Sequence, residues 1–249
     1  MSSNRFFVSE SGFEGECVRL SPEQAHQVCH VLRLKPGDGI VVLDDSGFEY
    51  DAVLLTVAGR EAACRITEKR PAGGEPKVQI TLFQSLLARE KFEWVLQKGT
   101  EVGVARFVPV LTQRSIVRGK RIEEKKFTRW RRILTEAAEQ SHRGRVPQLD
   151  REIAFAEAAA RLGSFDCSVI AAPSDSGISL KDALGSRVER PSSVALLIGP
   201  EGGLTDAEIA LACERGAVKV SLGPRILRTE TAAVVASALT LYELGQMMP

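Results

Sequence analysis

Apolar and polar residues alternate over short distances in the first third of the chain. Within residues 1–73, runs such as 39–43 and 51–55 are separated by Asp-Gly and Ser-Gly turns. Short alternating runs between turn residues are typical of a small β-barrel. One helix interrupts this pattern. It is expected to begin at Ser21, which would act as the N-cap ahead of Pro22 in the first turn.

The pattern changes after residues 71–76, Pro-Ala-Gly-Gly-Glu-Pro, which form the best candidate for a linker. Beyond it, strand-like and helix-like stretches alternate, and this order predicts a mostly parallel sheet flanked by helices. We therefore expect one domain in residues 1–73 and an α/β domain in residues 74–249. The expected elements of the second domain are strands at 78–83, 107–111 and 167–172, a helix over about 89–101, a long basic segment ending near 142, and two further strand–helix pairs.

Each of these last two strands runs directly into a turn that contains glycine. Residues 194–209 have the sequence VALLIGPEGGLTDAEI, and residues 218–239 have the sequence VKVSLGPRILRTETAAVVASAL. Thr205 is expected to cap the first of the two helices, with Glu208 completing a capping box. Because open α/β sheets bind ligands beyond the carboxyl ends of their strands, the two turns predict one composite pocket. Two ordinary strand-to-helix turns would show the same spacing. Neither turn has the pattern of a dinucleotide-binding loop or a P-loop.

The two segments resemble the signature segments of the SPOUT methyltransferases. More narrowly, they are similar to the RsmE family, the bacterial small-subunit ribosomal RNA uracil-N3 methyltransferases. The similarity extends through five further segments in the same order, which are Arg-Phe-Phe at 5–7, HVLRLKPGD at 30–38, EKFE at 90–93, QKGTEVG at 97–103 and AEQSHR at 138–143. It therefore covers nearly the whole chain.

The resemblance implies an architecture and an activity. It implies a PUA-like, RNA-binding β-barrel followed by a SPOUT domain whose C-terminal segment forms a deep trefoil knot and which pairs as a homodimer. It also implies transfer of a methyl group from S-adenosyl-L-methionine to N3 of a uridine in small-subunit (16S) ribosomal RNA, as free RNA or within an assembled subunit. Two alternatives stay open: a SPOUT methyltransferase that modifies another RNA atom, such as a ribose 2′-hydroxyl, and a non-catalytic RNA-binding factor in ribosome assembly.

The cofactor is expected to lie between the two glycine turns, whose backbone groups can contact the adenine edge. The expected cofactor-binding residues are Leu197, Gly199, Glu201, Gly202, Gly203, Leu222, Gly223, Ile226, Leu227, Arg228 and Thr231.

Uracil N3 carries a proton, so methylation requires a base or positive groups that stabilise the imide anion. The catalytic candidates are Glu139 as the base, with Arg143 and Arg228 as the stabilising cations. The other interpretations are a solvated helix end around Glu139 and an ion pair between Arg228 and Glu230 that only fixes the loop.

Charge is distributed unevenly, although the net charge is only +1. Residues 114–151 contain twelve Lys or Arg against five Asp or Glu, whereas residues 1–73 contain eight against eleven. A basic segment binds phosphates through charge, although a solvated helix face has the same composition. The expected RNA-binding residues are Arg5, His26, His30, Arg33, Lys35, Arg129, Arg131 and Arg132.

Composition limits the remaining possibilities. The chain has 249 residues, 44% of them hydrophobic, which is enough for one large or two small cores. It contains no run of 18 apolar residues and no apolar segment of signal-peptide type at its start. Its five cysteines are scattered and never form a CxxC pair, so they suggest neither disulfides nor a zinc site. We expect a reduced, cytoplasmic protein without a metal or a membrane partner.

Overall fold

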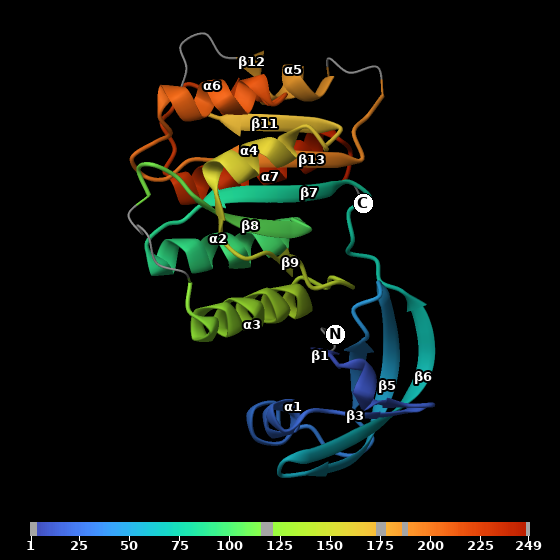
Figure 1. The fold of residues 1–249 in the computed structure, drawn as a ribbon. Coiled ribbons are helices and arrows are strands. Elements are labelled where there is room, and N and C mark those ends of the chain that lie inside the picture. The colour runs from blue at the N-terminus through green and yellow to red at the C-terminus, as the bar shows by residue number, and fades with distance from the viewer. Residues whose placement is uncertain (1–3, 116–121, 173–177, 186–188, 248–249) are drawn as a thin grey trace. The chain divides into compact units, whose positions relative to one another are not determined.

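A computed structural model describes residues 4–115, 122–172, 178–185 and 189–247 (Figure 1). The chain forms two compact units, of which the first consists of Met1–Glu75 with Ala138–Val146 and the second of Pro76–Ala137 with Pro147–Pro249. Residues 138–146, which the sequence placed in the second domain, thus belong with the first unit. Each unit is described separately below.

The first unit is built on a six-stranded mixed sheet. Its strand order is β1 (Arg5–Phe7), β4 (Gly39–Leu43), β5 (Phe48–Ala58), β6 (Glu61–Pro71), β3 (Cys17–Arg19) and β2 (Phe13–Glu14). The β1–β4 pair is parallel and the other pairs are antiparallel. A short helical turn, η1 (Glu10–Gly12), precedes β2.

One helical segment covers the core of this sheet. Helix α1 (Pro22–His26) continues into a π-helical turn, η2 (Gln27–Val31). The prediction that Ser21 caps α1 is confirmed, because its side chain accepts a hydrogen bond from the Gln24 amide in a complete capping box. Ala25 and Val28 are fully buried against the strand residues of the core, which include Phe6, Ile40, Leu54 and Cys64.

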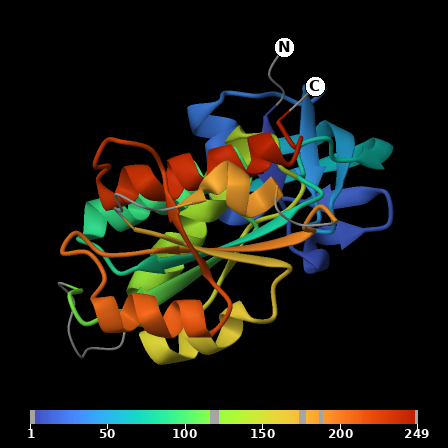
Figure 2. The same cartoon turned by 90° about the horizontal axis from the view of Figure 1, so that it is seen from above.

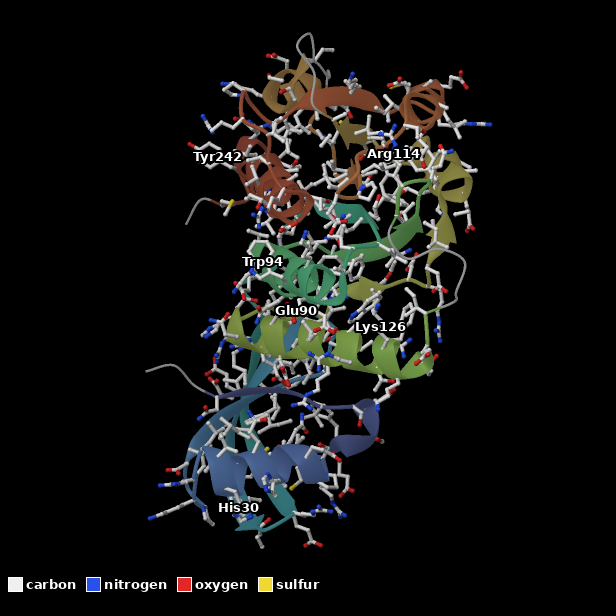
Figure 3. All side chains as sticks on the ribbon, turned by 90° about the vertical axis from the view of Figure 1, so that its left-hand side faces the viewer. His30, Glu90, Trp94, Arg114, Lys126 and Tyr242 are labelled. Carbon is white, nitrogen blue, oxygen red and sulfur yellow. The ribbon has the colours of Figure 1, made fainter. Side chains whose placement is uncertain are left out.

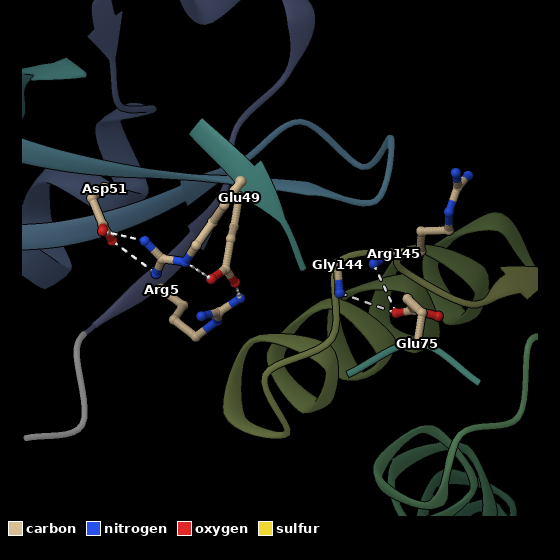
Figure 4. Close-up of polar contacts among 7 residues, drawn as sticks. Arg5, Glu49, Asp51, Glu75, Gly144 and Arg145 are labelled. Carbon is tan, nitrogen blue, oxygen red and sulfur yellow. Dashed lines mark hydrogen bonds and ion pairs between the residues drawn. The ribbon is translucent and has the colours of Figure 1, made fainter. Parts of the chain in front are cut away.

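Glu75 holds residues 138–146 in the first unit (Figure 4). Its carboxylate accepts hydrogen bonds from the Arg143 guanidinium at 2.9 Å and from the backbone amides of Gly144 and Arg145 at 3.0 Å each. A further hydrogen bond holds this segment: the backbone amide of Gly47 donates to the carbonyl of Gly144 at 3.2 Å.

The second unit contains an eight-stranded sheet in which all recorded pairs are parallel, which confirms the prediction of a mostly parallel sheet. The strand order is β10 (Ile153–Ala154), β8 (Arg106–Leu111), β7 (Gln79–Ser85), β13 (Ser193–Ile198), β11 (Cys167–Ala171), β14 (Val218–Ser221) and β12 (Ile178–Ser179), with β9 (Gln148–Leu149) paired to β8. The deep trefoil knot stays a prediction from the resemblance.

Helices cover both faces of this sheet (Figure 2). One face carries α2 (Arg89–Val102) and α7 (Thr229–Glu243), and the other carries α4 (Phe155–Leu162) and α6 (Asp206–Glu214). Helices α3 (Glu124–Gln140) and α5 (Leu180–Gly185) complete the set in the described part of the chain. The apolar side chains between the sheet and the α4–α6 face include Phe83, Val110, Ile170, Leu197 and Ala212, all almost completely buried.

Candidate active site

The site is positioned by the direction of the strands in the second unit. Because β7, β13, β11 and β14 are parallel neighbours, their carboxyl ends lie at one edge of the sheet, where α/β proteins bind ligands. Two loops leave this edge. The first loop, residues 199–205, joins β13 to α6, and the second loop, residues 222–228, joins β14 to α7.

Thr229, the first residue of α7, connects the two loops. Its hydroxyl donates a hydrogen bond to the Gly199 carbonyl and accepts one from the Gln84 side-chain amide at 3.3 Å. Gln84 is completely buried at the end of β7. The start of α7 is thus fixed both to the first loop and to the central strand.

The first loop is held from its other side by Arg114. The Arg114 Nη1 donates to the Gly202 carbonyl at 3.1 Å, and Gly203 adopts a φ of 70°, which favours glycine. A Cβ on Gly202 would lie 3.3 Å from the Arg114 Cβ, so the close approach of the two chains depends on the missing side chain. The predicted capping box of Thr205 and Glu208 is confirmed and fixes the start of α6 behind the loop.

Lys91 on α2 lies between two carboxylates. Its Nζ is 3.1 Å from Glu201 Oε1 in the first loop and 4.0 Å from Glu230 Oε2 in the first turn of α7. Lys91 lies in one of the segments that resemble the family, but no local feature of the sequence predicted a role for it. The alternative in which Glu230 pairs with Arg228 is not what the structure shows, since the ion partner of Glu230 is Lys91.

A cavity of about 330 Å³ lies at the second loop. Such a volume is within the usual range for small-molecule sites. Four predicted cofactor-binding residues line it, namely Leu222, Gly223, Ile226 and Leu227. The other six lining residues were not predicted from the sequence; they are Ala171, Ala172, Ser221, Pro224, Arg225 and Ala232. The end of the predicted strand at 167–172 was the available signal for the first two.

The other predicted cofactor residues have different surroundings. Gly199, Glu201, Gly202 and Gly203 lie in the first loop, where their contacts are those described above. Arg228 is exposed at the N-cap of α7, and Thr231 lies in the first turn of that helix.

Leu197 was predicted to bind the cofactor, but its side chain lies in the hydrophobic core. The side chain of Leu197 is 1% exposed and packs in the hydrophobic core beneath the α4–α6 layer, and Leu197 is not among the residues that line the cavity at the second loop.

Two of the three catalytic candidates occupy structural positions in the first unit. The Arg143 side chain is only 3% exposed and pairs with Glu75, so the expected role in stabilising a uracil anion is replaced by a structural one. Glu139 accepts a hydrogen bond from the Phe7 amide at 2.9 Å, which ties it to β1. We therefore do not retain Glu139 as the base.

The first unit presents most of its expected RNA-binding residues at the surface. His26, His30, Arg33 and Lys35 are exposed, and the two histidine rings lie 4.7 Å apart between centroids. Arg5 differs, because its side chain is 5% exposed and forms an ion pair with Glu49 (Figure 4). Arg5 thus has a structural role and is not included among the proposed RNA ligands.

The three arginines of α3 are exposed, and each pairs with a carboxylate. Arg129 pairs with Glu93 of α2 at 2.7 Å, Arg131 with Glu124 at 3.7 Å, and Arg132 with Glu136 at 2.6 Å. Part of the basic segment, residues 116–121, lies outside the described residues.

The described residues show neither a metal site nor a membrane-spanning helix. These residues contain no group of three or more His, Cys, Asp or Glu side chains placed to hold a metal ion. Among the same residues, none of the helices has the length and apolar character needed to cross a bilayer. All five cysteines are free thiols.

Two family descriptions match the chain, one for each part. The RNA methyltransferase domain family matches residues 74–241, and the RNA methyltransferase PUA domain family matches residues 20–67. Together they define an RNA methyltransferase with an N-terminal PUA domain.

Curated relatives narrow this class. The ribosomal RNA small subunit methyltransferase E of Bacillus subtilis (strain 168) is 35% identical over 234 residues, which cover 92% of this chain and 91% of the relative. The protein of the same name from Synechocystis is 34% identical and covers 89% of this chain and 71% of the relative. The chain belongs to the ribosomal RNA small subunit methyltransferase E family.

Solved structures agree with this placement. The ribosomal RNA small subunit methyltransferase E of Neisseria gonorrhoeae, bound to S-adenosyl methionine, has a TM-score of 0.86 at 32% identity and covers 96% of this chain and 97% of that chain. A methyltransferase from Legionella pneumophila, also in complex with S-adenosylmethionine, has a TM-score of 0.86 at 31% identity, with 97% and 98% covered.

Proposed function

We propose that this protein transfers the methyl group of S-adenosylmethionine to N3 of a uridine in small-subunit ribosomal RNA. The observation that supports this most directly is the pair of glycine loops, joined through Thr229 and Lys91, beside a cavity of about 330 Å³ at the carboxyl edge of the sheet. Relatives with this fold are described with S-adenosylmethionine bound.

The two loops fit such a cofactor chemically. The cavity is lined largely by small and apolar side chains with the backbone of the second loop, which suits the adenosine part. We propose that Gly199, Gly202, Gly203, Leu222, Gly223, Ile226, Leu227, Arg228 and Thr231 contact or shape the site of the cofactor. When bound, the cofactor supplies an already activated methyl group, so the protein has to align it with a deprotonated uracil.

The substrate is tested by comparing ribosomal RNA from cells with and without the gene. Nucleoside mass spectrometry should detect N3-methyluridine in small-subunit RNA from wild-type cells and not from the deletion strain. Loss of a 2′-O-methyl nucleoside instead would favour the alternative RNA methyltransferase. If no modified nucleoside is lost, and calorimetric titration shows that the purified protein does not bind S-adenosylmethionine, the non-catalytic assembly factor is favoured.

Two exposed surfaces are proposed to hold the RNA. The first surface lies in the first unit, which contains the PUA domain and is called the PUA unit, and consists of His26, His30, Arg33 and Lys35. The second surface lies on α3 and consists of Arg129, Arg131 and Arg132. Surface ion pairs contribute little free energy, so the pairs on α3 can be exchanged for phosphate contacts. Because the proposed substrate is ribosomal RNA, free or assembled into the small subunit, we place the protein in the cytoplasm.

We also propose a homodimer that forms through α2 and α7. These adjacent helices expose three large apolar side chains, Trp94 (40%), Leu239 (39%) and Tyr242 (57%), and Figure 3 shows Trp94 and Tyr242 on the same side of the molecule. An exposed apolar patch on packed helices is typical of a subunit interface. Light scattering should give twice the mass of the 27.1 kDa chain. A monomeric mass at micromolar concentration would contradict the proposal.

A further inference from the structure

Two side-chain oxygen atoms, one in the first turn of α7 and one in the neighbouring strand β7, are buried without a hydrogen-bond partner in the described part of the chain. These atoms are Glu230 Oε2 and Gln84 Oε1. They belong to neighbouring groups, because the amide of Gln84 donates to Thr229, the residue before Glu230. Buried acceptors are nearly always hydrogen-bonded in folded proteins, so two of them side by side at the candidate site call for a functional explanation.

Charge selects Glu230 as the functional acceptor of the two. Its side chain is 14% exposed and lies 4.0 Å from the Lys91 ammonium, which is too long for a hydrogen bond but close enough for electrostatic attraction. Helix α7 fixes the Glu230 backbone in its first turn. The carboxylate is therefore held in place by charge and by the helix, with Oε2 still able to accept a proton.

Neither of the other carboxylates considered has these properties. Glu201 Oε1 already accepts a hydrogen bond from Lys91 at 3.1 Å, and its loop position gives it less support than a helix. Glu139 accepts a hydrogen bond from the backbone amide of Phe7 and belongs to the first unit, which contains the PUA domain. In the described part of the second unit, Glu230 is thus the best-placed acidic group next to the cofactor loops.

We propose that Glu230 accepts the N3 proton of the target uracil and that Lys91 is its positioning residue. This inference rests on the proposed N3 methylation. The uracil would enter between the first loop and the start of α7. Lys91, which is 36% exposed, would stay between the carboxylate and the loop.

The step balances without another reactant. Glu230 takes the proton from N3, and the freed N3 electron pair forms a bond to the methyl carbon. The bond from that carbon to sulfur breaks with its electron pair remaining on sulfur, and Glu230 later releases its proton to water.

The main test is Glu230→Gln in the full-length protein, because this change keeps the shape of the side chain and removes its basicity. Single-turnover methylation at neutral pH should slow by about a hundredfold or more. The rate should recover partly at alkaline pH, where uracil loses its proton without help. Titration calorimetry should show unchanged affinity for S-adenosylmethionine. Glu214→Gln, at the exposed end of α6, is the matched control and should behave as wild type.

The positioning role of Lys91 is tested in the same assay. Lys91→Met should lower the single-turnover rate by about tenfold to a hundredfold, and Lys91→Arg should restore much of it. In the Glu230→Gln background, Lys91→Met should have a much smaller effect, because the carboxylate it positions is gone. Fully additive losses would contradict the link between the two residues.

The outcomes separate this inference from the proposed function. If the wild-type protein does not produce N3-methyluridine, the proposed function fails. If the wild type methylates N3 and Glu230→Gln is equally fast at neutral pH, only the role of Glu230 fails. A slow variant that has lost its affinity for S-adenosylmethionine, or that gains nothing at alkaline pH, would also overturn it, because Glu230 would then be a binding or structural residue.

Discussion

Gly223 sets the course of the second loop through its backbone alone. Its φ of 113° lies in the region that side chains rarely adopt, and a Cβ there would meet no atom within 4 Å. Any effect of a substitution therefore comes from backbone strain and not from a clash. The shape of the cavity at the second loop depends on this conformation, because Gly223 and its neighbours line that cavity, which we propose binds the cofactor.

We predict that Gly223→Ala weakens binding of S-adenosylmethionine. Strain of about 1–3 kcal/mol corresponds to a loss of affinity of roughly fivefold to 150-fold if it is relieved by moving the loop. Calorimetric titration measures the loss. Gly185→Ala is the control, since Gly185 has open space around its Cα and no positive φ. Equal affinities for the two variants would show that the loop binds its ligand in another conformation.

Asp166 makes the unfolding free energy of the second unit depend on pH in the acidic range. Its carboxylate accepts hydrogen bonds from the hydroxyl of Ser192 at 2.8 Å and from the amides of Ser192 and Ser193 at 2.9 Å each. These bonds, chiefly that from the Ser192 hydroxyl, lower the pKa of Asp166 from 3.8 to about 2. The folded state thus binds this proton more weakly than the unfolded state does.

A lowered pKa means that the stabilisation is complete above the unfolded value and is lost as the pH falls through the folded value. We predict that the contribution of Asp166 disappears between about pH 4 and pH 2. Asp166→Asn should therefore lower the free energy of unfolding at neutral pH and flatten its decrease over that interval. Denaturant titrations at several pH values measure this, with Glu214→Gln as the control. An unchanged slope in Asp166→Asn would assign the acid dependence to other carboxylates.

At the scale of elements, helices with strong local signals could be predicted from the sequence. Ser21 and Thr205 stand three residues before a Gln or Glu, and both cap their helices as expected. The capping box was predicted for Thr205 only, and Ser21 forms one as well. The apolar runs likewise gave β4, β7, β8 and β11 within one or two residues. Two- and three-residue strands such as β1 and β9 escaped, because they are defined by their partners and carry no periodic pattern of their own.

Helix α3 combines basic side chains with intramolecular ion pairs. Arg132 is 81% exposed and pairs with Glu136 one turn away, an arrangement worth only a few tenths of a kcal/mol. Phosphates can therefore compete for this guanidinium at little cost to the fold. The sequence supplied the charge and the local spacing of Arg132 and Glu136, but it could not supply the partner of Arg129, because Glu93 lies on another helix.

We predict that Arg132→Gln reduces the salt dependence of RNA binding while leaving stability nearly unchanged. One lost phosphate contact should lower the log–log slope by about one unit or slightly less. Binding of a small-subunit ribosomal RNA fragment is measured over a series of salt concentrations. Arg161→Gln is matched to it, because Arg161 also pairs with a Glu one turn away, on α4. If both variants keep the wild-type slope, α3 is a solvated face.

At the scale of the whole molecule, the sequence predicted two domains that meet near residue 74, and the structure has two units whose first part ends at Glu75. The sequence did not predict that residues 138–146 belong with the PUA unit, because Glu75 and Arg143 are 68 positions apart and neither has a local signal. The role of Lys91 was not predicted for the same reason, because its ion partner Glu201 is 110 positions away in the sequence. Glycine turns and caps leave local signals in a sequence, whereas long-range ion pairs leave none.

The last prediction concerns this discontinuous unit. The Arg143 side chain is 3% exposed, and its positive charge is balanced by the carboxylate of Glu75. The same carboxylate accepts hydrogen bonds from the backbone amides of Gly144 and Arg145. Glu75→Gln removes the balancing charge and leaves a buried guanidinium with a weaker partner. Since breaking a buried ion pair costs several kcal/mol, the unfolding free energy of the PUA unit should fall by roughly 3 kcal/mol.

Chemical denaturation measures this change, and hydrogen exchange of the Gly47 amide, which donates to the Gly144 carbonyl, reports on the affected segment. Glu68→Gln, on the exposed side of β6, is the control. Affinity for S-adenosylmethionine should be unchanged, because the cofactor loops belong to the other unit. If Glu75→Gln is as stable as the control and its Gly47 amide exchanges no faster, residues 138–146 are held by their backbone contacts and the buried pair contributes nothing to their attachment.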